Sequence, residues 1–183
     1  VFVSAALTSG LVSQDQIDEA ISTVYETQSA GVSGVTDEQL ASQLVQMGSL
    51  TPYQAQQLKG GRTKLNLGPY LVTDWIGQGG MGMVFKAEHI MMGRQVAIKV
   101  LPRHKSTPAA IEGFTREIRA QAKLDHRNLV RAYDAGHDGN AYYLVTEFVE
   151  GTDLRRLVRS QGRLLVQQAA SILMQSALGL SHA

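Results

Sequence analysis

The stretch that decides the fold runs from Gly77 to Lys99 and contains Gly77-Gln-Gly-Gly-Met-Gly-Met-Val84, followed by Val96-Ala-Ile-Lys99. Its first part has the pattern G-x-G-x-x-G-x-V, a glycine-rich loop whose backbone can approach phosphate groups because glycine has no Cβ. Taken alone, this spacing also fits a plain hairpin turn or a dinucleotide-binding loop. A dinucleotide-binding loop opens a helix, whereas here β-type runs lie on both sides, and the Gly-Lys-Ser/Thr ending of a Walker A loop is missing. The pattern therefore favours a β-hairpin that lies over phosphates.

Lys99 ends a run of small and β-branched apolar residues that is typical of a largely buried strand. A buried ammonium group without a counterion is costly, so a carboxylate partner is expected. Glu117 lies in the helical stretch 109–123, on its apolar side, and is the predicted partner. The alternatives are an edge lysine that reaches solvent and a Glu117 carboxylate that pairs with Arg116 or Arg119.

Strand-type and helix-type runs follow one another in an order that predicts an α+β fold. Strands are expected at residues 70–76, 83–88, 94–101, 129–135 and 141–147, and helices at 109–123, 153–160 and 166–183. This order predicts a five-stranded antiparallel sheet with one packed helix, followed by the start of a helical region.

The chain before residue 60 is rich in Gln, Ser and Ala and shows no strand-like alternation. Ser13-x-x-Gln16, Thr36-x-x-Gln39 and Thr51-Pro-x-Gln54 have the spacing of capping boxes, which predicts three helix starts. We expect about four short helices with a core made by Leu7, Ile17, Ile21, Leu40, Leu44, Leu50 and Leu58.

A weak internal repeat runs through these helices, since residues 7–16 resemble residues 45–54. In each copy a glycine closes one helix, an apolar residue follows, and a capped helix begins. The predicted organisation is a small all-α domain at 1–60, a glycine-rich basic linker at 61–67, a sheet domain at 68–150 and the start of a helical domain at 151–183.

Composition excludes several classes of protein. The formal net charge is +1, which gives no reason to expect nucleic acid or an anionic membrane as partner, and the chain has no cysteine for disulfides or zinc sites. No segment approaches the roughly 18 continuous apolar residues of a membrane span, and the apolar start lacks the basic residues of a signal peptide. The histidines show no paired spacing for a metal. Because the chain begins without methionine and ends inside a helical pattern, we expect a piece of a longer protein.

Five motifs in order carry a resemblance to a known family. They are G77-Q-G-G-M-G-M-V84, V96-A-I-K99, F114-T-R-E117-I, L124-D-H-R-N-L-V130 and Y143-L-V-T-E-F-V-E-G151. From about Leu67 onward the chain resembles eukaryotic-like protein kinases, in particular the bacterial serine/threonine kinases. The resemblance covers the last two-thirds of the chain. It implies the kinase N-lobe and the first helices of the C-lobe.

The resemblance implies a role for each matching residue. The glycine-rich loop (Gly77, Gln78, Gly79, Gly80, Met81 and Gly82) would approach the phosphates of ATP. Lys99 would pair with the α- and β-phosphates and would be oriented by Glu117, and these two are the catalytic candidates. Around the adenine would lie Val84, Ala97, Thr146, and the backbones of Glu147 and Val149. Asp153 matches a ribose-contacting position, and its alternative role is a carboxylate that favours a helix N-terminus.

The family's H-R-D-x-x-x-x-N, D-F-G and A-P-E motifs do not occur in this sequence. The catalytic Asp and the Mg²⁺ ligands would lie beyond it, so the chain alone is expected to be inactive. The resemblance implies that the parent protein transfers the γ-phosphate of Mg·ATP to Ser or Thr of a protein substrate in signalling. The alternative is a pseudokinase that serves as a nucleotide-binding or scaffold module. The expected location is cytoplasmic, with any membrane anchor further along the parent, and the N-terminal helices are either a module for a protein partner or a structural support.

Overall fold

The computed structural model describes residues 1–27, 34–79, 82–101 and 106–183. These residues form two compact units. One unit contains Val1–Ile76 and Phe85–Arg94, and the other contains Gly77–Val84 and Gln95–Ala183. The glycine-rich loop and the Lys99 strand therefore belong to the same unit.

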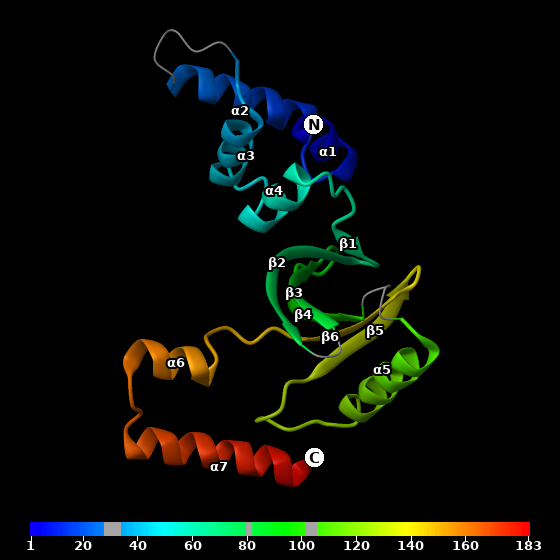
Figure 1. Cartoon of the computed structure of the whole chain (residues 1–183), viewed down its shortest axis with the longest axis vertical. Helices are drawn as coiled ribbons and strands as arrows, with labels where there is room; N and C mark the ends of the chain where they lie inside the picture. Colours follow the sequence, from blue (N-terminus) through cyan, green and yellow to red (C-terminus); the bar gives the residue numbers. More distant parts are fainter. Residues whose placement is uncertain (28–33, 80–81, 102–105) are drawn as a thin grey trace. The chain divides into compact units, whose positions relative to one another are not determined.

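Four helices begin the chain, as the sequence predicts (Figure 1): α1 (Phe2–Ser9), α2 (Gln14–Thr27), α3 (Asp37–Gln46) and α4 (Pro52–Lys59). Their core is made mainly by Phe2, Ala6, Ile17, Ala20, Leu40, Ala41, Leu44, Leu50 and Leu58. Leu7 was expected inside but is 37% exposed. The inward side of α1 is instead made by Phe2, Ala5 and Ala6, which places the next residue, Leu7, on the outer side.

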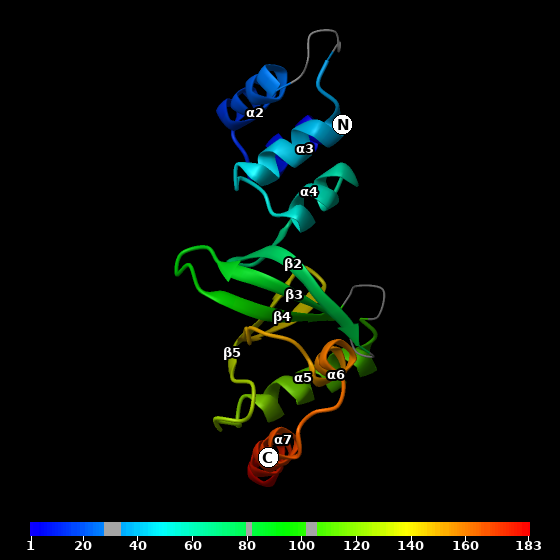
Figure 2. The ribbon, with the colours of Figure 1, turned by 90° about the vertical axis from the view of Figure 1, so that its left-hand side faces the viewer.

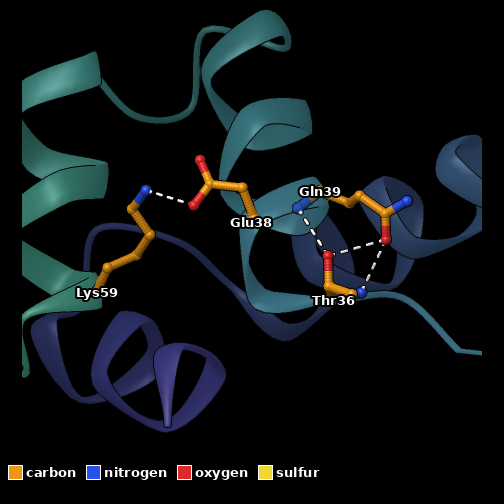
Figure 3. A network of polar contacts seen from close by, with 4 residues as sticks. All are labelled: Thr36, Glu38, Gln39 and Lys59. Atoms are coloured by element: carbon orange, nitrogen blue, oxygen red, sulfur yellow. Dashed lines mark hydrogen bonds and ion pairs between the residues drawn. The ribbon is translucent and has the colours of Figure 1, made fainter.

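All three predicted capping boxes are present. Ser13 and Gln16 exchange bonds at the start of α2, with the Ser13 N–H donating to Gln16 Oε1 over 2.9 Å. Thr36 and Gln39 do the same for α3, and Thr51 and Gln54 for α4. Figure 3 shows the Thr36–Gln39 box with the ion pair that joins Lys59 at the end of α4 to Glu38 at the start of α3, 2.7 Å apart.

The internal repeat corresponds to two similar helix corners. Gly10 after α1 and Gly48 after α3 have φ of 70° and 74°, a left-handed conformation that glycine adopts without strain. Two residues after each glycine an apolar side chain, Val12 or Leu50, is buried. The structure therefore has, at both corners, the glycine and the apolar residue that the sequence pattern predicts.

The predicted linker contributes to packed structure. Leu65 is buried in the core of the four helices, and Asn66–Leu67 form the short strand β1, which pairs antiparallel with β2 (Tyr70–Gly79).

The remaining strands complete one sheet. They are β3 (Gly82–His89), β4 (Gln95–Leu101), β5 (Ala132–Asp138) and β6 (Ala141–Glu147). Among the described residues the strand order is β1-β2-β3-β4-β6-β5, so the five predicted strands are present and β1 is an addition. Strand β6 pairs antiparallel with both β4 and β5. Strand β5 starts at Ala132 rather than Leu129, because Leu129 is held in a turn by a backbone bond to His126.

Helices make up the rest of the second unit. Helix α5 (Pro108–Gln121) precedes β5, and α6 (Leu154–Gln161) and α7 (Val166–His182) end the chain. Figure 2 shows the same ribbon from the side. Asn128 joins α7 to the turn before β5 by donating from Nδ2 to the Gln175 carbonyl over 2.9 Å. Among the described residues, no helix has the length and apolar character needed to cross a membrane.

Candidate functional site

The two faces of β4 differ in burial. Val96, Ile98 and Val100 are buried, whereas Ala97 and Lys99 alternate with them and are partly exposed. Because successive side chains of a strand point to opposite faces, Ala97 and Lys99 share one face of the sheet. The sequence run that predicted a buried strand therefore directs its lysine to the less buried side.

Strand β6 adds its own residues to this face. Thr146 lies opposite Ala97, and Leu144 lies opposite Lys99. Directly opposite residues of an antiparallel pair share a face. The Thr146 hydroxyl donates to the Ala97 carbonyl over 3.4 Å. Of the predicted adenine-contacting residues, Ala97 and Thr146 are therefore neighbours.

Helix α5 packs on the same face. Its N-terminus is capped by Thr107, whose hydroxyl accepts from the Ala110 N–H, and Pro108 occupies a first-turn position where a missing N–H costs nothing. Phe114 is fully buried in a cluster with Leu101 and Leu144. The helix is thus fixed to the sheet at the strand pair that carries Lys99.

Lys99 and Glu117 form the ion pair that the sequence predicts. Lys99 Nζ lies 2.5 Å from Glu117 Oε1, and the two side chains are 27% and 30% exposed. Lys99 Nζ also lies 6.0 Å from the centroid of the Phe114 ring, near the outer limit of a cation–π contact. Phe114 and Glu117 are three residues apart on one side of α5, so one helix face supplies both contacts.

Both alternative interpretations of this pair disagree with the structure. Lys99 is not an edge lysine, because β4 lies between two other strands in the sheet. Arg116 pairs with Glu112 instead of Glu117, over 3.1 Å and on a part of α5 where both side chains are 76% exposed.

The second carboxylate oxygen of Glu117 has no hydrogen-bond partner among the described residues, although it is buried. Most buried polar atoms in folded proteins are hydrogen-bonded, so an exception requires a reason. Donors of the described residues therefore satisfy only one of the two oxygens of this carboxylate. Glu117 Oε2 remains available to a donor from outside the described residues.

The glycine-rich loop joins the end of β2 to the start of β3, as expected for a hairpin. Gly80 and Met81 lie outside the described residues. A Cβ at Gly82 would overlap the Val100 carbonyl group, so this glycine is required by the close approach of two backbones. A Cβ at Gly77 or Gly79 would meet no described atom within 4 Å, and neither residue has positive φ. The described fold therefore explains one of these three glycines and leaves the other two to a functional explanation.

The remaining predicted residues lie beside or after these elements. Gln78 is exposed at the end of β2, and Val84 is partly buried on β3. Glu147 ends β6, and its N–H donates to the Arg131 carbonyl over 2.9 Å. Val149 is exposed in the connection between β6 and α6.

Asp153 is the N-cap of α6. Its carboxylate accepts from the Arg156 N–H over 2.8 Å. This hydrogen bond, assisted by bonding to Arg155 and by both arginine charges, lowers the pKa of Asp153 below its usual value. The helix-capping alternative is therefore observed, and ribose contact stays a prediction.

Phe114 is a residue of the site whose role the sequence motifs did not predict. The ring packs beneath the sheet and faces the Lys99 ammonium group, so it limits where that side chain can lie. The sequence does contain a signal for this contact. Phe114 and Glu117 are three residues apart, so they lie on the same side of a helix. Among the described residues, no three His, Asp or Glu side chains come together to hold a metal ion.

Comparison with known proteins identifies relatives for the sheet and the helices after it. The family model described as "Protein kinase domain" matches residues 70–183. The serine/threonine-protein kinase PrkC of Bacillus subtilis is 38% identical over 117 residues, which cover 63% of this chain and 18% of that protein. The serine/threonine-protein kinase PknA of Mycobacterium tuberculosis is 37% identical over 124 residues, which cover 63% of this chain and 29% of PknA. The chain thus spans less than a third of the length of these curated relatives.

Solved structures show the same fold. The Mycobacterium tuberculosis PknI kinase domain matches with a TM-score of 0.55 at 22% identity, over 64% of this chain and 47% of that one. A crystal structure of Rad53 in complex with AMP-PNP matches with a TM-score of 0.52 at 28% identity, over 66% of this chain and 31% of that one. The α+β arrangement predicted from the sequence is confirmed.

Proposed function

Because the chain belongs to the protein kinase domain family, we propose that β2–β6 and α5 form the Mg·ATP-binding part of a bacterial-type serine/threonine protein kinase. The whole protein transfers the γ-phosphate of ATP to a Ser or Thr hydroxyl of a protein substrate in signalling, in the cytoplasm. The curated relatives support the choice of serine and threonine, since they carry that name. The observation that carries the proposal is the ion pair between Lys99 and Glu117 on the less buried face of the sheet.

In this proposal the Lys99 ammonium group binds the α- and β-phosphates. Glu117 acts as a positioning residue, because its carboxylate fixes the direction of a long and flexible side chain. Glu117 holds the Lys99 ammonium group before a nucleotide binds. Because the two side chains are partly exposed, the ammonium group can still contact an anion. A cation held in place before binding loses less entropy when the phosphates arrive.

The glycine-rich loop covers the phosphates with backbone N–H groups. Gly77 and Gly79 support this role, since no contact within the described part of the chain requires a glycine at either position. Gly80 and Met81 belong to the same proposed loop. The adenine would lie against Val84, Ala97 and Thr146, and would bond to the Glu147 carbonyl and the Val149 N–H. Mg²⁺ would supply charge neutralisation on the phosphates.

The proposal is tested by Lys99→Met in the full-length protein. Removing the phosphate-binding cation should lower phosphotransfer by about 10²-fold or more, as expected for loss of a charged group that stabilises a transition state. Protein folding should persist, because methionine fills a similar volume on the same strand.

Lys123→Met is the matched control, since Lys123 is an exposed lysine just after α5. Its activity should equal that of the unchanged protein. Retained phosphotransfer in Lys99→Met would contradict the proposal. Tight Mg·ATP binding in the unchanged protein without phosphotransfer would instead support the alternative function, a nucleotide-binding scaffold.

A further inference from the structure

The capping box of α4 contacts the sheet as well as its own helix. The Thr51 hydroxyl accepts from the Gln54 N–H over 3.1 Å and donates to the Thr73 carbonyl of β2 over 2.6 Å. Gln54 Oε1 accepts from the Thr51 N–H over 2.9 Å, and Gln54 Nε2 donates to the Val72 carbonyl of β2, also over 2.9 Å. Each side chain thus caps the helix with one part and holds β2 with another.

This arrangement is specific to α4. Gln54 is 4% exposed, and among the described residues it is the one buried side chain that is neither apolar nor aromatic. In the box of α2, the matching amide of Gln16 donates to Ser49 within the helical region. In the box of α3, Gln39 bonds to Thr36, as Figure 3 shows. Helix capping alone therefore does not explain the burial of Gln54.

Apolar and aromatic contacts also join the helices to strands β2 and β3. Leu71 of β2 packs against the core of the four helices. The Tyr53 ring of α4 lies 6.3 Å from the Phe85 ring of β3, and Phe85 meets Trp75 of β2 edge-on with centroids 5.4 Å apart. All these residues belong to one compact unit. Burial raises the pKa of the Tyr53 phenol, with Arg62 opposing and Asp74 of β2 adding to the rise.

Strand β2 connects this contact to the proposed nucleotide site. It runs without interruption from Tyr70 to Gly79, so Thr73 lies four residues before Gly77 on the same strand. Four residues of a strand span about 13 Å. Hydrogen bonds that fix the Val72 and Thr73 carbonyls restrict how the strand can twist and shift as it enters the glycine-rich loop.

We propose that Thr51 and Gln54 are positioning residues for the glycine-rich loop, through which the N-terminal helices favour nucleotide binding. This inference rests on the proposed function. When the end of β2 is already held in place, it loses less conformational entropy on contact with phosphates. The effect should fall on affinity for Mg·ATP rather than on the transfer step. By linkage, bound Mg·ATP should strengthen the contact between α4 and β2 by the same factor.

The test is a double variant that keeps the helix cap and removes both bonds to β2. In Thr51→Asp, the carboxylate still accepts from the Gln54 N–H but has no hydroxyl to donate to the Thr73 carbonyl. In Gln54→Glu, the carboxylate still accepts from the Thr51 N–H but cannot donate to the Val72 carbonyl. The matched control is Thr36→Asp with Gln39→Glu, the same changes in the box of α3.

Two readouts separate the contact from catalysis. Trp75 is the single tryptophan of the chain, so its fluorescence reports on the β2–Phe85 contact without nucleotide. Hydrogen exchange of residues 70–79 reports on the strand itself. In the full-length protein, the KM for ATP and kcat are measured separately.

We expect the double variant to raise the KM for ATP roughly 5- to 20-fold, within the range of typical coupling between sites, with kcat changed less than about twofold. Trp75 emission should shift and exchange of β2 should accelerate, while the α3 control changes neither. The single variant Thr51→Ser keeps the hydroxyl and should have the same KM for ATP as the unchanged protein. If the double variant does not fold, the single Thr51→Asp variant carries the same test.

An unchanged KM for ATP in a variant whose β2 exchange has accelerated would overturn the inference. A fall in kcat equal to the change in kcat/KM would do the same, because it would place the effect on the transfer step. Failure of the proposed function is distinguishable, since it would appear as absent Mg·ATP binding in the unchanged protein, with the Trp75 and exchange results unaffected.

Discussion

Two polar pairs in this protein differ in how completely their atoms are bonded. Thr51 and Gln54 bond to each other and to two carbonyls of β2, so each polar atom of these side chains has a partner in the fold. Lys99 and Glu117 also pair, yet the buried Glu117 Oε2 has no partner among the described residues. A fully bonded pair is explained by the structure it stabilises. A half-bonded pair indicates a site that something else completes.

The largest expected effect concerns two glutamates on α5, each paired with a cation. Glu117→Ala should lower kcat/KM for ATP in the full-length protein by about 10²-fold, because Lys99 loses the group that orients it. Glu112→Ala removes an exposed pair with Arg116, worth about 0.3–0.5 kcal/mol, and should leave activity unchanged. Steady-state kinetics of both variants checks this. Equal effects of the two changes would mean that the Glu117 pair is merely structural.

The glycines of the loop offer a second comparison. Gly82→Ala should destabilise the fold by about 1–3 kcal/mol, since its Cβ would collide with the Val100 carbonyl and the backbone must shift. Gly79→Ala should change stability by less than about 0.5 kcal/mol, because no atom of the described residues lies within 4 Å of the added Cβ.

Gly79 is expected to matter for nucleotide binding although it matters little for stability. Gly79→Ala should weaken Mg·ATP binding about tenfold, the loss of roughly one hydrogen bond to a charged phosphate. Denaturant unfolding and nucleotide titration of the same variants measure the two effects. A Gly79→Ala protein with unchanged affinity would show that this glycine has no part in nucleotide binding.

The smallest effect is a pH dependence at the start of α6. The pKa of Asp153 is lower in the folded chain than its usual value near 3.8, chiefly through the Arg156 N–H. The cap therefore contributes fully above about pH 3.8 and is lost as the pH falls through the folded pKa. The NMR shift of the Arg156 amide should follow this titration.

Asp153→Asn keeps an oxygen acceptor and should abolish the titration while α6 remains capped. An Arg156 amide that titrates equally in both proteins would contradict the assignment. If Asp153 also contacts ribose, the Asn variant should retain the helix and lose affinity for ATP.

Local patterns in the sequence predicted much of this structure. The Ser/Thr-x-x-Gln boxes act within four residues, so Thr36, Thr51 and their partners could be identified directly. The Lys99–Glu117 pair follows from the cost of a lone buried charge and from one helix register. Strand β1 was missed because two residues, Asn66 and Leu67, carry no periodicity.

Other features depend on contacts that no local pattern contains. The bonds from Thr51 and Gln54 to β2 join residues 22 and 18 positions apart, respectively, and only the packed structure brings them together. The start of β5 depends on a backbone bond to His126. Asp153 matched two roles because a carboxylate before a helix fits both a cap and a ligand contact.

On the proposed function, the Lys99 ammonium group lies at the phosphates of bound ATP. An acyl-phosphate derivative of ATP tests it directly, because an amine near the phosphates attacks the acyl carbonyl, takes the acyl group and releases ATP. Mass spectrometry of the full-length protein should find Lys99 acylated, with labelling suppressed by excess Mg·ATP. Labelling that avoids Lys99, or that Mg·ATP does not suppress, would contradict the account.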